Sequence, residues 1–208
     1  MLRIIVVRHG ETDHNKNNIL QGHLDIPLNE TGLRQAEKLS VWLKERYVID
    51  HIYSSPLTRA LKTAEIVAER QTGRLALLPG LMEIDVGQWQ GLTSEQCKLA
   101  DPELCQELRQ DGLHTRRPGG ESYWDLYQRT SAVLEKLVKE HTSGTIALFT
   151  HGGCVRTIIA HAMSAPPELF AFNSPLMVGN TSFSLLEYLH GSRRWQVKTI
   201  NATCHLLS

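Results

Sequence analysis

The stretch that decides the fold is Ile4-Ile5-Val6-Val7-Arg8-His9-Gly10, in which an apolar run ends in arginine, histidine and glycine. A continuous run of mostly β-branched residues predicts a central strand that is buried on both faces. A second strongly apolar run, residues 145–150, ends in a similar way at His151-Gly152-Gly153. We therefore expect two central strands, each of which delivers a histidine and then a glycine to its carboxyl end.

Helical patterns alternate with these strands. Capping residues predict helices that begin at Thr31, at Ser55-Pro56 and at Ser122, each followed by apolar residues at helical spacing. Short strands are expected near residues 51–53 and 75–78. Strands that alternate with helices predict an α/β fold with a mostly parallel sheet.

The remaining segments complete a single domain over residues 1–208. Residues 93–117 have a helical but more polar pattern, which predicts a small helical lid or cap insertion. Residues 182–188 and 195–200 predict two strands joined by a turn near Gly191, which can add an antiparallel pair at the edge of a mixed sheet.

The composition excludes several classes of protein. Lysine and arginine total 22, as do aspartate and glutamate, so the net charge of zero argues against a nucleic-acid partner or an anionic membrane. No apolar run approaches the roughly 18 to 20 residues of a membrane-spanning helix, and no signal peptide is recognisable. Four cysteines without a C-x-x-C pair favour neither a disulfide scaffold nor a zinc site. We expect a soluble cytoplasmic protein. Its edge strands could pair with those of a second copy to form a homodimer.

The predicted sheet brings cationic side chains to one edge. Ligands of parallel sheets bind beyond the carboxyl ends of the strands, where His9 and His151 would face one another. A third strand leads into a helix that carries Arg59, and the start of that helix is positive by its dipole. Together with Arg8, these groups suit a dianionic phosphate, because one guanidinium can donate two parallel hydrogen bonds to two phosphate oxygens. Glu83, in a glycine-dotted loop, is a candidate acid, although it could equally be a surface carboxylate.

Further motifs follow in order along the chain. They are Arg8-His9-Gly10-Glu11-Thr12, Gln21-Gly22, Ser54-Ser55-Pro56-Leu57-Thr58-Arg59-Ala60, Glu83-Ile84-Asp85-Val86-Gly87-Gln88-Trp89-Gln90-Gly91, Gly119-Gly120-Glu121-Ser122 and Thr150-His151-Gly152-Gly153. With these blocks the sequence resembles the phosphatase branch of the histidine phosphatase superfamily, whose fold is phosphoglycerate-mutase-like. The resemblance implies a three-layer α/β/α sandwich and a small phosphomonoester as the substrate, hydrolysed through a phosphohistidine intermediate.

The resemblance also implies roles for individual residues. His9 would be the nucleophile, Arg8, Arg59 and His151 would hold the phosphoryl oxygens, and Glu83 would protonate the leaving oxygen and later activate water. The set that completes the phosphate pocket would be Asn15, Gln21, Gly22 and Gly152. We expect neither a metal nor a cofactor, because the arginines supply the positive charge that phosphoryl transfer needs.

Two other functions are alternatives to a phosphatase. Cofactor-dependent mutases of this family resemble one another in a longer insertion after the acid, whereas only residues 84–118 separate Glu83 from Gly119 here. A non-catalytic protein that binds phosphorylated ligands would be favoured by loss of His9, His151 or either arginine, and all four are present.

The substrate is left open among phosphoserine, a sugar phosphate and a phosphoglycerate derivative. Candidate specificity residues are Val86, Trp89, His114, Arg116 and His205. His114 and Arg116 could meet a second anionic group or form a solvated basic turn. The tail around His205 is similar to that of metal-independent phosphoserine phosphatases of the superfamily and could close over the pocket. Those phosphatases tend to carry a histidine where Val86 stands.

Overall fold

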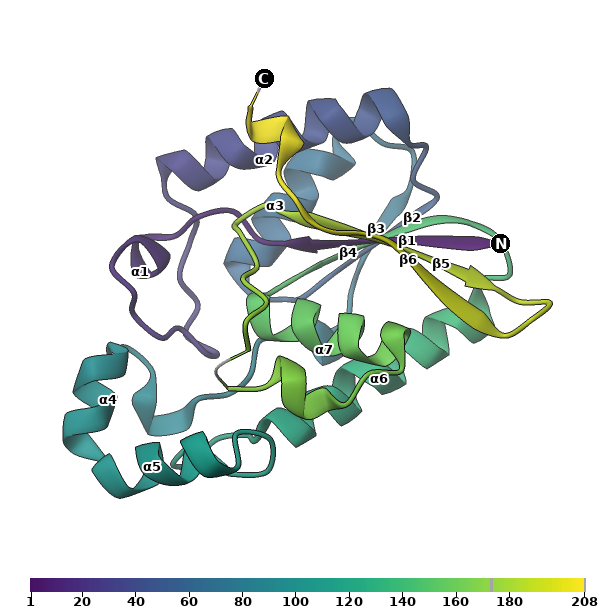
Figure 1. Ribbon diagram of the computed structural model, residues 1–208. Helices are drawn as coiled ribbons and strands as arrows, with labels where there is room; N and C mark the ends of the chain where they lie inside the picture. The colour runs from purple at the N-terminus through teal and green to yellow at the C-terminus, as the bar shows by residue number, and fades with distance from the viewer. Residues whose placement is uncertain (173, 208) are drawn as a thin grey trace.

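A six-stranded mixed sheet forms the centre of the computed structural model, which describes residues 1–172 and 174–207 (Figure 1). The strands are β1 (Leu2–Arg8), β2 (His51–Ser54), β3 (Arg74–Leu77), β4 (Gly144–Thr150), β5 (Phe183–Leu189) and β6 (Arg194–Ala202). In the order β3-β2-β4-β1-β5-β6, the first four strands are parallel, and β5 and β6 are antiparallel at one edge. The mostly parallel sheet with its terminal antiparallel pair is thereby confirmed.

Helices cover both faces of this sheet, which confirms the three-layer α/β/α sandwich (Figure 1). Helices α2 (Glu30–Arg46) and α3 (Thr58–Ala68) lie on one face, and α6 (Tyr123–Glu140) and α7 (Gly152–Met163) lie on the other. The shorter elements are α1 (Asp13–Lys16), α4 (Ser94–Ala100), α5 (Pro102–Gln110) and the 3₁₀ turns η1 (Pro79–Leu81), η2 (Gly87–Trp89), η3 (Pro167–Phe170) and η4 (Cys204–Leu206). Within the described residues, no helix is long and apolar enough to cross a membrane.

Strand β1 explains why the sandwich has two cores. Successive side chains of a strand point to opposite faces of the sheet. Ile4 and Val6 accordingly belong to the core beneath α6 and α7, and Ile5 and Val7 belong to the core beneath α2 and α3. All four side chains are fully buried, so the apolar run that predicted a central strand fills both layers at once.

Two of the predicted helix starts are wrong, and long-range contacts explain one of them. Asn29, and not Thr31, caps helix α2. Its side chain accepts a hydrogen bond from the Gly32 N–H at 2.8 Å. Helix α3 begins at Thr58 because Asp25, from a distant loop, accepts both its N–H and its hydroxyl at 2.7 Å. Ser122 caps α6 as predicted.

Candidate active site

The register of β1 and β4 places the two strand-end histidines side by side. Arg8 pairs with Thr150 across the two parallel strands, and the His9 N–H donates to the Thr150 carbonyl at 2.9 Å. The next residue on each strand is therefore a histidine, and the ring centroids of His9 and His151 lie 5.1 Å apart. Both side chains are buried, as expected for groups at the centre of the sheet edge.

Hydrogen bonds assign a different tautomer to each histidine. Nδ1 of His9 lies 2.6 Å from the Gly10 carbonyl, and because a carbonyl can only accept, Nδ1 carries the proton and Nε2 keeps a lone pair. His151 is the reverse. Its Nδ1 accepts from Arg59 Nε at 3.2 Å, so its Nε2–H is available to donate to the Ser55 hydroxyl at 2.8 Å.

The electrostatics of the site keep both imidazoles neutral. Burial, followed by the charges of Arg8 and Arg59, lowers the pKa of His9 well below 6.5. Burial and Arg59 likewise hold the pKa of His151 well below that value. Burial lowers the pKa of each of the two guanidinium groups to about 10, which leaves them charged at neutral pH. The site thus combines two neutral imidazoles with two fixed cations.

A turn after β1 brings amide side chains toward the same pocket. Thr12 caps the short helix α1, and Asn15 Oδ1 accepts from the Thr12 N–H at 3.2 Å. The Thr12 hydroxyl donates to Gln21 Oε1 at 3.0 Å. Gly22 has a positive φ of 49°, and an added Cβ would crowd the side chain of Val86. Its carbonyl accepts from Arg59 at 2.8 Å, which ties this turn to α3.

Glu83 enters the site from the loop after η1. Its Oε1 accepts from the Ile84 N–H at 2.9 Å, and its Oε2 accepts from the Gly153 N–H at 3.2 Å, in the first turn of α7. The Cβ that any other residue would place at position 153 would collide with Glu83 Oε1, so glycine is needed for this close approach. The carboxylate is therefore fixed against the same sheet edge as the histidines.

One cavity of about 250 Å³ unites most of the predicted residues. Its lining includes Arg8, His9, Asn15, Gln21, Gly22, Arg59, Glu83, Val86 and Gly152. His151 is fully buried beside His9 and does not itself line the cavity. A larger groove of about 680 Å³ between α6, α7 and the β5–β6 hairpin contains none of the predicted residues, so size alone does not locate the site.

The structure separates other candidate specificity residues from this cavity. Trp89 lines an adjoining cavity of about 340 Å³, and its indole N–H donates to Asp101 at 2.6 Å. His114 is exposed and contacts Asp111, and Arg116 pairs with Asp125 at 2.7 Å. His205 is buried in the η4 turn, where it contacts Thr181 of the loop before β5. It does not line the cavity.

Arg156 is the main residue that sequence reasoning missed. It lines both the cavity beside His9 and the adjoining one, and its buried Nε has no hydrogen-bond partner among the described residues. Arg117 and Tyr123 also line the adjoining cavity. The spacing was a usable signal, since Arg156 follows Gly152 by four positions and so lies on the same face of α7.

The described residues contain no group of three or more His, Cys, Asp or Glu side chains arranged to hold a metal ion. The positive charge at the sheet edge comes from Arg8, Arg59 and Arg156. A site with two neutral imidazoles, fixed guanidinium groups and one carboxylate is equipped to bind a phosphoryl group, attack it and protonate its leaving group.

Comparisons with known proteins agree with this chemistry. The model of the histidine phosphatase superfamily (branch 1) matches residues 4–203. Phosphoserine phosphatase 1 of Hydrogenobacter thermophilus is 32% identical over 99% of this chain and 95% of its own length. A metal-independent phosphoserine phosphatase of Arabidopsis thaliana is 35% identical over 78% of this chain and 70% of its own. The structure of a mycobacterial glucosyl-3-phosphoglycerate phosphatase superimposes with a TM-score of 0.85 at 30% identity, covering 96% of this chain and 99% of that one.

The chain belongs to the histidine phosphatase superfamily (branch 1). Within that class it is a phosphoric monoester hydrolase, which confirms the resemblance found in its motifs.

Proposed function

We propose that this enzyme hydrolyses a small phosphomonoester that carries a second anionic group, through a phosphohistidine intermediate on His9. The observation that carries the proposal is Arg156, a partly buried cation at the junction of the two cavities whose Nε has no partner among the described residues. The relatives named for phosphoserine and for a glucosyl phosphoglycerate support it, since both compounds carry a carboxylate besides the phosphate.

In the first half-reaction, Nε2 of His9 attacks phosphorus while Arg8 and Arg59 hold the equatorial oxygens. The bond from phosphorus to the ester oxygen breaks, and Glu83 donates a proton to that oxygen. The negative charge of the transition state is spread over oxygens that fixed cations already face, so little reorganisation is needed. His151 holds Arg59 in place through its Nδ1.

In the second half-reaction, the Glu83 carboxylate takes a proton from water. The water oxygen attacks phosphorus, the phosphorus–nitrogen bond breaks, and inorganic phosphate leaves with His9 restored as a neutral imidazole. The Gly10 carbonyl keeps Nδ1 protonated throughout, so the nucleophile has the same tautomer at the start of every cycle. The arginines supply the charge stabilisation, and we propose that no metal takes part.

The adjoining cavity accounts for the rest of the substrate. Its walls are mainly apolar, with Trp89, Phe172 and Tyr123 among them. Buried Arg117 lies 4.9 Å over the Tyr123 ring. A phosphomonoester seated at His9 can therefore direct a carboxylate to Arg156 and a short carbon skeleton along this wall. Phosphoserine and phosphoglycerate derivatives fit this description better than phosphates of neutral sugars, which have no second anionic group. A cytoplasmic location and a homodimer remain predictions from the sequence.

The test compares phosphate release from phosphoserine, 3-phosphoglycerate, glucose 6-phosphate and p-nitrophenyl phosphate, with a chelator present. We expect the two carboxylated compounds to give the highest kcat/KM. Replacing one charged hydrogen-bond donor costs roughly 1.5–3 kcal/mol, so Arg156→Met should raise their KM about 10- to 100-fold. The KM for p-nitrophenyl phosphate, which has no second anion, should hardly change.

Three outcomes would contradict the proposal. Activity that the chelator abolishes and a metal restores would exclude the metal-free mechanism. Full activity of His9→Ala would exclude the nucleophile. An equal effect of Arg156→Met on all four compounds would exclude the second anionic subsite while leaving the phosphatase itself intact.

A further inference from the structure

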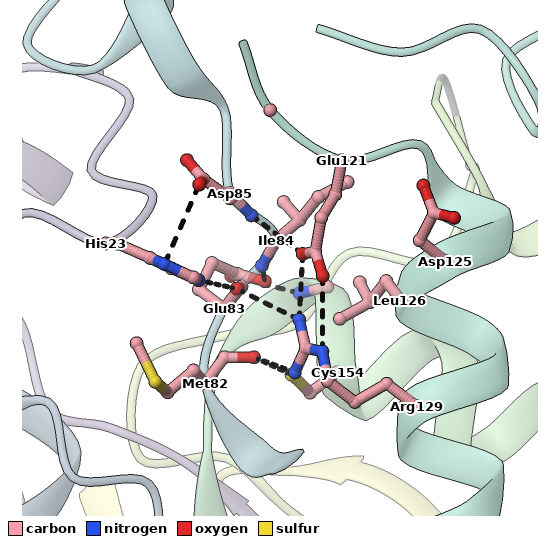
Figure 2. A network of polar contacts seen from close by, with 12 residues as sticks. His23, Met82, Glu83, Ile84, Asp85, Glu121, Asp125, Leu126, Arg129 and Cys154 are labelled. Carbon is pink, nitrogen blue, oxygen red and sulfur yellow. Dashed lines mark hydrogen bonds and ion pairs between the residues drawn. The ribbon is translucent and has the colours of Figure 1, made fainter. Parts of the chain in front are cut away.

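The loop that carries Glu83 is held by a single arginine from another element. Arg129, in the middle of α6, donates to the carbonyls of Gly80 at 3.0 Å, Met82 at 2.8 Å and Glu83 at 3.3 Å. Figure 2 shows the Arg129 side chain reaching this loop from α6, with dashed lines to the carbonyls of Met82 and Glu83 and to the Glu121 carboxylate. Three carbonyls of one four-residue stretch therefore converge on one cation.

Glu121 completes the arrangement from the loop before α6. Its two oxygens accept from Arg129 at 2.8 and 3.3 Å, and its Oε2 also accepts from the Asp85 N–H at 2.9 Å. The five N–H groups of a guanidinium match the five acceptors in number. Both side chains are about one quarter exposed, so the pair is partly shielded from water.

We propose that Arg129 and Glu121 are a positioning pair. They fix the position and orientation of the Glu83 carboxylate at the leaving-group side of the site. The inference rests on the proposed role of Glu83 as the proton donor. Neither residue lines the cavity beside His9, so the pair acts through the backbone of residues 80–85.

Other side chains also contact this loop, but each reaches fewer carbonyls than Arg129 does. His23 Nε2 lies 2.8 Å from the Glu83 carbonyl, and the Cys154 thiol donates to the Met82 carbonyl at 2.9 Å (Figure 2). His23 contacts one carbonyl and the Cys154 thiol lies within reach of two, those of Leu81 and Met82, whereas Arg129 is charged and donates to three. A lysine at position 129 would keep the charge, but it has no planar fork to span the same acceptors.

The signature of a misplaced acid is a dependence on the leaving group. Alkyl phosphates such as phosphoserine need a proton on the departing oxygen, whereas p-nitrophenolate leaves without one. We expect Arg129→Lys to lower kcat/KM for phosphoserine about 10-fold or more, and for p-nitrophenyl phosphate less than about 3-fold. Glu121→Gln should show the same pattern with a smaller loss. Arg3→Lys, which alters an arginine–carboxylate pair at 3.3 Å far from the site, is the matched control.

Glu83→Gln separates the failure of this inference from the failure of the proposed function. If Glu83→Gln loses activity equally on both substrates, Glu83 is not the proton donor. If Glu83→Gln discriminates between the substrates but Arg129→Lys and Glu121→Gln lower both equally, the pair only stabilises the fold and the inference is wrong. Support requires that Arg129→Lys added to Glu83→Gln cause little further loss on phosphoserine, as expected for residues that act through one group. Circular dichroism checks that each variant folds, and Glu121→Gln serves if Arg129→Lys does not.

Discussion

At the scale of the residue, Gly153 shows how a missing side chain can be part of a site. Its N–H donates to one oxygen of Glu83, and the space where a Cβ would stand is occupied by the other oxygen. The sequence places two glycines directly after His151, at the carboxyl end of a predicted strand. That Gly153 admits a carboxylate from a loop 70 positions away in the chain could not be predicted, because no local pattern encodes the approach.

We predict that Gly153→Ala displaces Glu83 and weakens proton donation. Losing a charge-assisted hydrogen bond costs roughly 1.5–3 kcal/mol, so kcat/KM for phosphoserine should fall about 10- to 100-fold. The loss for p-nitrophenyl phosphate should be several times smaller. Gly191→Ala is the control, because a methyl group there meets open space. A loss that is equal for both substrates would mean that the methyl group damages the phosphate pocket and not the acid.

At the scale of the element, the loop that precedes β5 contacts the backbone of His9, the proposed nucleophile. The Asn180 side chain donates to the His9 carbonyl and to Asn15 Oδ1, both at 3.1 Å. The Thr181 N–H donates to the same His9 carbonyl at 3.1 Å, and Arg8 donates to the Val178 carbonyl. This one loop therefore contacts three residues of the candidate site, which are Arg8, His9 and Asn15.

We predict that Asn180→Ala slows phosphorylation of His9 without unfolding the protein. The side chain bridges two groups of the pocket, and small misplacements of reacting groups are costly in rate. The rate of phosphohistidine formation, followed by rapid quench with a labelled substrate, should fall about 10-fold. The melting temperature should change by only a few degrees. Gln196→Ala, an exposed amide on β6, is the control. An unchanged phosphorylation rate would show that the loop is dispensable for the nucleophile.

The elements also show which parts of the fold were predictable. Apolar runs predicted β1 and β4 and the histidines that follow them, because a strand buried on both faces has a continuous run of apolar residues. Asp25 as the cap of α3, Arg129 beneath the Glu83 loop and Asn180 above His9 were not predicted. Each acts through a contact between segments far apart in the chain, and such contacts depend on the finished fold.

At the scale of the whole molecule, burial of histidines links stability to pH. Burial lowers the pKa of His9 and His151 well below 6.5, and it lowers the pKa of His205 to about 4. Near pH 5.5 these side chains are neutral in the folded protein and mostly protonated in the unfolded chain. The unfolded state then binds more protons, so stability is complete above about pH 6.5 and is lost as the pH falls toward the folded-state values.

We therefore predict that the free energy of unfolding falls as the pH is lowered from 7.5 to 5, well before most carboxylates titrate. His9, His151 and His205 each contribute up to about 1.4 kcal/mol per pH unit within their windows, which together approach about 4 kcal/mol per pH unit near pH 5.5. Burial also lowers the pKa of His141 and His161, and these two histidines add to the slope in the same direction. Urea unfolding at half-unit intervals of pH measures this slope. His205→Gln removes one titrating group, and it should reduce the slope by up to about 1.4 kcal/mol per pH unit whatever it does to stability at pH 7.5. The slope is thus separated from the lost contact with Thr181, which shifts the whole curve without changing its shape. A wild-type curve that stays flat between pH 7 and 5 would mean that the buried histidines do not resist protonation, and the neutral nucleophile at His9 would lose its physical basis.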